Sequence, residues 1–153
     1  MSTSNDNNVD ARSDYWGRDG LGQAILDALA ASGKGLDALT IDDLGPMDHF
    51  HGGGNPPTTR LAQLPGLTPD LRVLDVGGGL GGPAHTLAVE FGCNVTVVDL
   101  TESYVQAARE LTARLGLTGQ VMHQVGNALE LPFEDGQFDV VWTQNSGMSI
   151  HNK

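Results

Sequence analysis

Hydrophobic residues recur at helical spacing in the first part of the chain. Over residues 21–32 they follow the three-and-four pattern of an amphipathic helix. Thr40 starts a variant of the capping box, and the short helix after it is expected to stop at Pro46. Asn55, read as an N-cap before proline, predicts a further helix that runs to about residue 64.

After Pro69 the pattern changes to short apolar runs that alternate with helical segments. This alternation is typical of parallel strands joined by helices, and it predicts an α/β fold with a Rossmann-like, doubly wound parallel sheet. The last run is apolar on both faces, as in a buried parallel strand. The expected strands cover 71–76, 94–99, 120–125 and 138–143, and the expected helices cover 83–91 and 101–115.

These patterns divide the chain into three parts. Residues 1–13 are rich in Ser, Asn and Asp and poor in apolar residues, so we expect them to be a disordered tail. Residues 14–66 are expected to form an N-terminal helical cap, and residues 67–153 the part that contains the sheet.

Composition narrows the classes of function. The chain has 153 residues, of which 39% are hydrophobic, so it is long enough for one domain with a core. Its net charge of −11 and its lack of a basic face argue against a nucleic-acid partner. The single cysteine, Cys93, is expected to be a buried, inert thiol. Because the sequence has no apolar leader and no stretch long enough to span a bilayer, we expect a cytoplasmic protein without a membrane partner.

A glycine-rich turn carries the most informative chemistry. It follows an apolar run that ends in Asp75, and Asp99 closes the next apolar run. Glycine lets the backbone approach a ligand closely, and an acid at the end of the second strand accepts hydrogen bonds from ribose hydroxyls. The turn fits two fingerprints, the dinucleotide pattern through Gly77, Gly79 and Gly82, and the pattern D-x-G-x-G-x-G through Asp75, Gly77, Gly79 and Gly81.

The second fingerprint resembles motif I of the class I S-adenosylmethionine-dependent methyltransferases. Charge favours it, because no Lys or Arg occurs between Arg72 and Arg109. A pyrophosphate binds best near cations and helix N-termini. S-adenosylmethionine carries a sulfonium and an ammonium group but no phosphate, so it suits an acidic loop without cations.

The resemblance extends over residues 71–144, where three motifs occur in the order and spacing of that family. They read VLDVGGGLGG, VTVVDLT and GNALELPFEDGQFDVVWTQ. The LPFEDGQFDVV stretch is typical of small-molecule methyltransferases. In the cap, residues 48–53 and 59–60 are similar to the glycine, sarcosine and dimethylglycine N-methyltransferases and to the tocopherol methyltransferases.

The resemblance implies S-adenosyl-L-methionine as cofactor and assigns residues to it. The backbone at Gly77, Gly79 and Gly81 would lie against its methionine part and ribose. Asp75 would orient the ammonium group, directly or through water, and an alternative or additional role is to cap the backbone N–H groups of the glycine turn. Asp99 would bind the ribose hydroxyls.

The adenine side is assigned in the same way. Leu100 would pack near the adenine, and Ala128 and Leu129 would flank it. Asn127 departs from the family pattern, which has an Asp there; its amide oxygen can accept from the adenine amino group without a charge, so weaker adenine selection is expected. The residues after the last strand, where the family lines the methyl-transfer site, are Gln144 and Asn145.

The implied reaction is methyl transfer to a small-molecule acceptor, an amine, a phenol or a carbon nucleophile. It is an in-line displacement that needs alignment of acceptor and methyl group, but neither a metal nor a covalent intermediate. The catalytic residue is unassigned. His49, His51, Tyr15 and His151 are candidates for a general base, although packing or surface roles are favoured for each, and His123, inside a strand, is expected to be structural.

The resemblance also predicts the strand order 3-2-1-4, with the cofactor crevice between strands one and four. A complete sheet of this family has more strands, and the sequence stops at Lys153. We therefore expect a C-terminally truncated fragment of a longer enzyme, or a short cofactor-binding module, that self-associates through an exposed fourth strand.

Two other functions stay open. An NAD(P)-dependent oxidoreductase accounts for the glycines and Asp99 but not for Asp75, and a non-catalytic binding protein would have kept only the fold.

Overall fold

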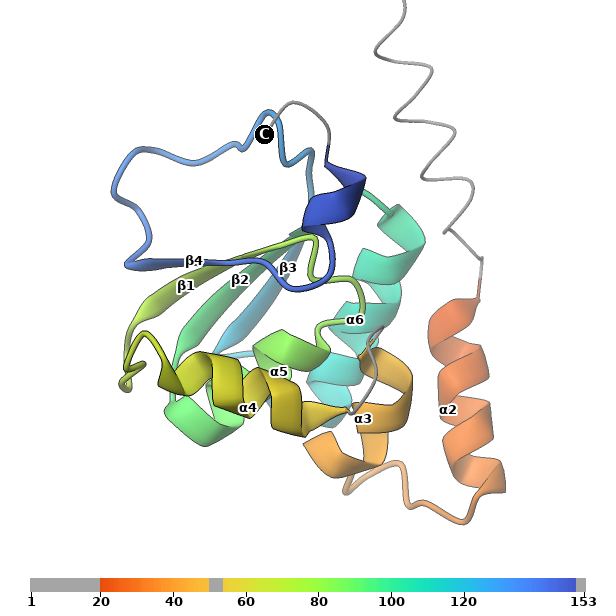
Figure 1. The fold of residues 1–153 in the computed structure, drawn as a ribbon. Helices are drawn as coiled ribbons and strands as arrows, with labels where there is room; N and C mark the ends of the chain where they lie inside the picture. Colours follow the sequence, from red (N-terminus) through yellow and green to blue (C-terminus); the bar gives the residue numbers. More distant parts are fainter. Residues whose placement is uncertain (1–19, 50–53, 151–153) are drawn as a thin grey trace, which may run out of the picture.

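Helices precede the strands along the chain, as the hydrophobic pattern predicts. The computed structural model describes residues 20–49 and 54–150, and Figure 1 shows a sheet with helices packed against it. Its elements are α2 (Leu21–Ala31), α3 (Ile41–Asp48), α4 (Asn55–Gln63), β1 (Arg72–Val76), α5 (Gly82–Phe91), β2 (Asn94–Asp99), α6 (Glu102–Arg114), β3 (Val121–Val125), β4 (Val140–Trp142) and a 3-10 turn, η1 (Gly147–Ser149). The predicted tail 1–13, Tyr15, His51 and His151 lie outside the described residues.

The strands form one sheet in the order β3-β2-β1-β4, and every pairing is parallel. The chain moves outward from β1 to β3 and then returns to the other side of β1. This reversal confirms the expected strand order. It also opens a crevice at the carboxyl ends of β1 and β4, the place where open α/β sheets bind their ligands.

Alternate side chains of the strands pack on opposite faces of the sheet. Val73 and Val97 lie on the face that α5 covers, in a cluster of fully buried residues. Leu74 lies on the other face, where Phe133 and Phe138 of the connection between β3 and β4 pack against it. Figure 1 shows this connection, in blue, on the side of the sheet away from α5. The alternation has a period of two, because successive side chains of a strand point to opposite faces.

The cap helices complete the helical layer. α2 packs along α6, while α3 and α4 both contact α5 (Figure 1). The α2–α6 contact buries one apolar cluster, which includes Ile25, Leu26, Leu29, Ala107 and Leu111. We call the glycine-rich turn at residues 77–82 the glycine loop. Its Leu80 joins the same cluster, so the cap and the loop share part of the core. In residues 20–49 and 54–150, no helix is long and apolar enough to cross a membrane.

Local signals predict the start of α3 correctly but not its end. The capping box at Thr40 is confirmed, since Asp43 donates its backbone N–H to the Thr40 hydroxyl and accepts from the Thr40 N–H. Pro46, however, lies inside α3, so the prediction that it stops the helix is wrong. The residue before it is Gly45, which has no Cβ to clash with the proline ring, and the helix continues to Asp48.

The N-cap of α4 is Gly54, so the prediction of Asn55 in that role is wrong. The Asn55 side chain instead donates to a carboxylate oxygen of Asp42 at 3.1 Å, which links α4 to α3.

The last strand is shorter than its apolar run. β4 covers only Val140–Trp142 instead of 138–143, and the side chain of Val141 is 67% exposed, so burial on both faces is also a wrong prediction. Phe138 leaves the strand because its ring packs edge-to-face on Phe133, with 4.9 Å between the ring centroids. The other predicted strands and helices agree with the structure to within one or two residues.

Candidate functional site

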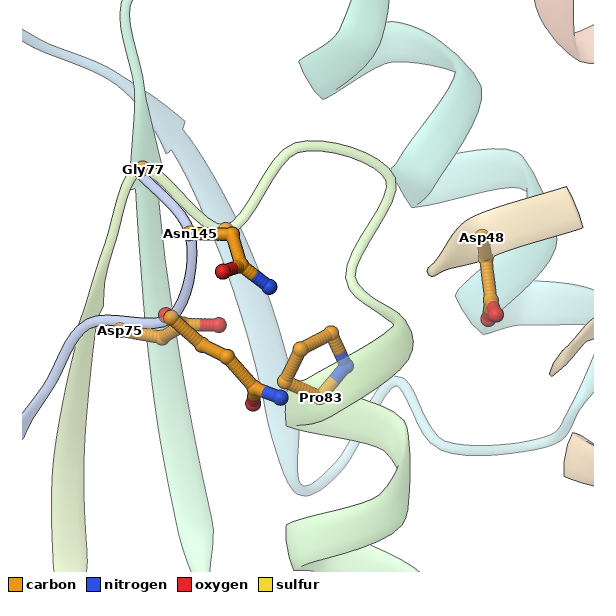
Figure 2. A pocket seen from close by; sticks show the side chains of 7 residues that line it. Asp48, Asp75, Gly77, Pro83 and Asn145 are labelled. Carbon is orange, nitrogen blue, oxygen red and sulfur yellow. The ribbon is translucent and has the colours of Figure 1, made fainter. Parts of the chain in front are cut away.

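A pocket opens where the carboxyl ends of β1 and β4 meet the first turn of α5. Figure 2 shows Asp75 on β1, Gly77 at the start of the glycine loop and Asn145 after β4, with Pro83 at the start of α5 and Asp48 at the end of α3. The complete lining is Asp48, Asp75, Gly77, Gly78, Pro83, Gln144 and Asn145. The pocket therefore lies at the crevice that the strand order predicts, and its only charged lining residues are acidic.

Asp75 is a buried carboxylate with an oxygen that lacks a hydrogen bond within the described residues. Its side chain lies in the sheet core with 1% exposure, and its Oδ2 atom has no partner among the described residues. Burial, and secondarily the negative charge of Asp99, raise the pKa of Asp75 to about 7. An unpaired buried carboxylate is costly, so one beside a pocket is suited to a cationic ligand. The alternative role of Asp75, capping the glycine turn, is not found.

Asp99 takes that capping role. Its Oδ2 accepts from the backbone N–H of Gly79 at 2.9 Å, and its Oδ1 accepts from the N–H of Thr101 at 2.9 Å. Each oxygen keeps a further lone pair, so the carboxylate can still accept hydrogen bonds from a ligand. Asp99 thus lies at the end of β2, next to the loop that follows β1, as the sequence motif predicts.

The loop after β4 packs directly on the first glycine. A Cβ added at Gly77 would lie 2.4 Å from the Cβ of Ser146, and the φ of +73° at Gly77 also favours glycine. The Ser146 hydroxyl donates to the carbonyl of Val76 at 2.8 Å and is 2.7 Å from the hydroxyl of Thr143. Ser146 was not predicted as a site residue, because its contact with the glycine loop spans 70 positions of sequence.

The other glycines are required by protein contacts as well. A Cβ at Gly78 would lie 2.5 Å from Oδ2 of Asp75, and one at Gly81 would lie 2.7 Å from the ring of His123. Gly77 and Gly78 line the pocket, whereas a Cβ added at Gly81 would point toward the rings of His85 and His123. The assignment of Gly79 and Gly81 to a cofactor stays a prediction.

The residues after β4 connect the pocket to the cap. Gln144 accepts a hydrogen bond from the hydroxyl of Thr58 on α4 at 3.2 Å. Asn145 adopts a left-handed φ of +58°, which is uncommon for a residue other than glycine. Sequence motifs pointed to Gln144 and Asn145 but not to Thr58, which lies 86 residues away from its partner.

The residues predicted to surround adenine lie outside this pocket. Leu100 is half-buried at the end of β2, and Ala128 packs under the sheet with Phe133. Asn127 uses its amide oxygen to accept from the backbone N–H of Leu129 at 3.0 Å, which shapes its own loop. Their role toward adenine therefore remains a prediction.

A buried chain of polar side chains runs behind the glycine loop. Asp48 contacts Nδ1 of His49 at 2.8 Å and Nδ1 of His85 at 3.2 Å. The other ring nitrogen of His85, Nε2, is 2.8 Å from the Thr112 hydroxyl, which is 2.7 Å from Nε2 of His123. We name Asp48, His85, Thr112 and His123 the buried polar chain. Sequence patterns missed it, because its members come from four different elements.

Burial and hydrogen bonding shift the pKa values of the two ends of this chain in different ways. Burial alone raises the pKa of Asp48, but hydrogen bonds from His49 and His85 outweigh it and lower the pKa below its ordinary value. Burial, followed by the charges of His85 and Arg109, lowers the pKa of His123 to about 3. Asp48 is therefore an ionised carboxylate at neutral pH, and His123 is a neutral, structural histidine, as expected. In the described part of the chain, no group of His, Cys, Asp and Glu could hold a metal ion.

Comparisons with known proteins identify the family. The model of the family described as methyltransferase domain matches residues 73–153. Over 87 residues the chain is 41% identical to the glycine/sarcosine/dimethylglycine N-methyltransferase of Actinopolyspora halophila, a match that covers 57% of this chain and 15% of that protein. Over 82 residues it is 39% identical to the chloroplastic tocopherol O-methyltransferase of Arabidopsis thaliana, covering 54% of this chain and 24% of that protein.

A solved structure with a similar fold is that of geranyl diphosphate C-methyltransferase from Streptomyces coelicolor A3(2), in complex with Mg2+, geranyl diphosphate and S-adenosyl-L-homocysteine. The TM-score is 0.58 and the identity 26%, and the match covers 61% of this chain and 36% of that chain. The chain thus spans less than half the length of each of these relatives. Because the family model matches more than half of the chain, the chain belongs to the methyltransferase domain family, and the resemblance stated above is confirmed.

Proposed function

We propose that this methyltransferase-family chain binds S-adenosyl-L-methionine in the crevice between β1 and β4 and takes part in methyl transfer to a small-molecule acceptor. The observation that supports the proposal most is Asp75, a fully buried carboxylate whose Oδ2 has no partner among the described residues and which borders the pocket. A ligand with an ammonium group would supply the missing partner. S-adenosyl-L-homocysteine, which is bound in the related Streptomyces coelicolor structure, carries the same group.

The residues present fit the cofactor. Asp75 would accept from its ammonium group, the backbone of Gly77 and Gly78 would lie against its amino-acid part, and the free lone pairs of Asp99 would accept from the ribose hydroxyls. A dinucleotide fits less well, because no Lys or Arg between Arg72 and Arg109 can pair with a pyrophosphate.

The cofactor supplies an activated methyl group, and the protein supplies orientation. Methyl transfer depends on an acceptor atom held in line with the breaking bond to sulfur, and positioning of this kind contributes much of the rate of such reactions. Gln144, held by Thr58, and Asn145 line the pocket after β4, so they would contact the reacting groups. The acceptor is proposed only as a class: an amine, a phenol or a carbon nucleophile.

Calorimetric titration tests the proposal directly. The chain should bind S-adenosylmethionine and S-adenosylhomocysteine more tightly than NADH, and Asp75→Asn should weaken both of the former. Tighter binding of NADH would overturn the cofactor assignment in favour of an oxidoreductase. Transfer of a labelled methyl group to a panel of amines and phenols then separates an enzyme from a non-catalytic cofactor-binding module.

A further inference from the structure

A second acidic residue lines the pocket, and no motif of the sequence assigns it a role. Asp48 ends α3 and lines the same pocket as Asp75 on β1. In Figure 2 the two acids lie on opposite sides of Pro83, which lies in the first turn of α5. The side chain of Asp48 is 1% exposed, so solvent screens its charge very little.

The buried polar chain keeps this carboxylate ionised and in place. Nδ1–H groups of His49 and His85 donate to its two oxygens. The other ring nitrogen of His85, Nε2, is 2.8 Å from the Thr112 hydroxyl, which is 2.7 Å from Nε2 of His123. These contacts fix the orientation of the His85 ring that faces Asp48. Each carboxylate oxygen accepts up to two hydrogen bonds, so Asp48 retains capacity for a ligand.

Two acidic residues with different hydrogen bonding thus line one pocket. Asp48 accepts hydrogen bonds at both oxygens and is charged, whereas Oδ2 of Asp75 has no hydrogen-bond partner among the described residues. A cationic group between them would be attracted by the charge of Asp48 and would satisfy Asp75. Within the described residues, no Lys or Arg lines the pocket to play that part.

We propose that Asp48 is a recognition residue for the ammonium group of the bound cofactor, and that His85, Thr112 and His123 are positioning residues that hold its carboxylate in place. This proposal rests on the proposed function, because it requires a ligand with an amino-acid end in this pocket. The proposal goes beyond the proposed function, because it assigns a part in cofactor recognition to α3 of the helical cap and to buried residues of α5, α6 and β3.

Three ligands separate the contributions of charge and shape. S-adenosylmethionine and S-adenosylhomocysteine both carry the ammonium group, whereas 5′-methylthioadenosine has the same nucleoside without it. Asp48→Asn should weaken the first two by roughly tenfold or more, because a hydrogen bond to a charged group is lost. The affinity for 5′-methylthioadenosine should stay within about twofold, since the nucleoside lies at Asp99.

A substitution in the middle of the chain tests the positioning role. Thr112→Val removes the hydroxyl that joins His85 to His123 and should lower the affinity for S-adenosylmethionine, but not that for 5′-methylthioadenosine, while Thr112→Ser should restore it. The matched control is Thr86→Val. Thr86 is equally buried on α5, but within the described residues its hydroxyl bonds only the Gly82 carbonyl of its own helix, at 3.1 Å.

The outcomes are distinguishable. If the unsubstituted chain binds none of the three ligands, the proposed function fails. If it binds all three and Asp48→Asn weakens them equally, or weakens none, the proposed function survives and the role of Asp48 is overturned. If Asp48→Asn fails to fold, the affinities of Thr112→Val and Thr86→Val for S-adenosylmethionine are compared instead. Equal losses of affinity in these two variants would overturn the positioning role.

Discussion

The carboxylate of Asp99 accepts the backbone N–H of Gly79 at 2.9 Å, so the acid that ends β2 also fastens the glycine loop that follows β1. This contact connects the ends of two neighbouring strands, where a nucleoside is proposed to bind. The structure shows the role of this side chain in shaping the loop, and the proposed function adds a second role, the acceptance of hydrogen bonds from ribose hydroxyls.

Replacing Asp99 should separate these roles. Asp99→Ala removes both, so S-adenosylhomocysteine should bind at least about tenfold more weakly, since hydrogen bonds to a charged group contribute about 1.5–3 kcal/mol each. The amide of Gly79 should also exchange its hydrogen faster, because it loses its acceptor. Calorimetry and hydrogen exchange measure the two effects. An unchanged affinity would show that Asp99 serves only the loop.

The stability of the protein should depend on pH through Asp75. Its pKa rises from 3.8 to about 7 on folding, because burial and the charge of Asp99 disfavour the ionised form. The folded state therefore holds a proton that the unfolded state has released. This contribution to stability is complete below about pH 4 and is lost as the pH rises through 7.

Asp75→Asn should abolish this loss. The unfolding midpoint in urea should be higher for the variant than for the unsubstituted chain at pH 8, with a smaller difference at pH 5. Asp135→Asn, at an exposed position, is the control and should change neither value. Equal pH dependence in Asp75→Asn and the parent chain would contradict this prediction.

Cofactor binding should follow the opposite trend with pH. The ammonium group requires the ionised form of Asp75, whose population rises roughly tenfold between pH 6 and pH 8 around a pKa of about 7. The other carboxylates near Asp75 are Asp99 on β2 and Asp48 on α3. Affinity for S-adenosylhomocysteine should therefore increase over that range, and Asp75→Asn should flatten the profile measured by calorimetry.

The sequence predicts those parts of the fold that depend on local periodicity. The parallel strands and the capping box at Thr40 follow from short patterns, whereas the strand order follows from the family resemblance. The contacts that shape the site are not local. His85 meets Asp48 across 37 positions and Thr112 across 27, and no spacing rule brings such partners together.

The family was more predictable than the geometry of the site for the same reason. Asp75, Gly77 and Asp99 lie in short motifs; the first two line the pocket, and Asp99 holds the glycine loop beside it. The sequence could not show that Gly77 must leave room for Ser146, which reaches it only after the return connection to β4. Pro46 likewise remains in α3 because of the residue that happens to precede it.

Gly77 gives a prediction that depends on this packing. In Gly77→Ala the new Cβ would meet Ser146 at 2.4 Å, and the φ of +73° would strain any other residue. The variant should lose about 1–3 kcal/mol of stability and bind the cofactor weakly, because the loop after β4 must move. Gly119→Ala is the matched control, since a Cβ there meets nothing within 4 Å. Urea unfolding of both variants measures the difference, and equal stability would show that the loop adapts.

The edge at β4 leads to the last prediction. β4 pairs with β1 on one side, and among residues 20–49 and 54–150 no strand pairs with its other side. Its central residue, Val141, is 67% exposed. A strand edge with unpaired backbone groups and an exposed apolar side chain favours pairing with another chain. We therefore expect this chain to self-associate as its concentration rises.

A charge on that strand should suppress the association, because a lysine at an edge opposes strand pairing. Val141→Lys should lower the weight-average sedimentation coefficient at high concentration toward the value of a monomer. Val89→Lys is the control, since Val89 is 53% exposed on α5, away from the strand edge. If both lysine variants associate as strongly as the parent chain, β4 is not the contact. If both dissociate, added charge alone explains the effect, so only a response confined to Val141→Lys assigns self-association to this strand.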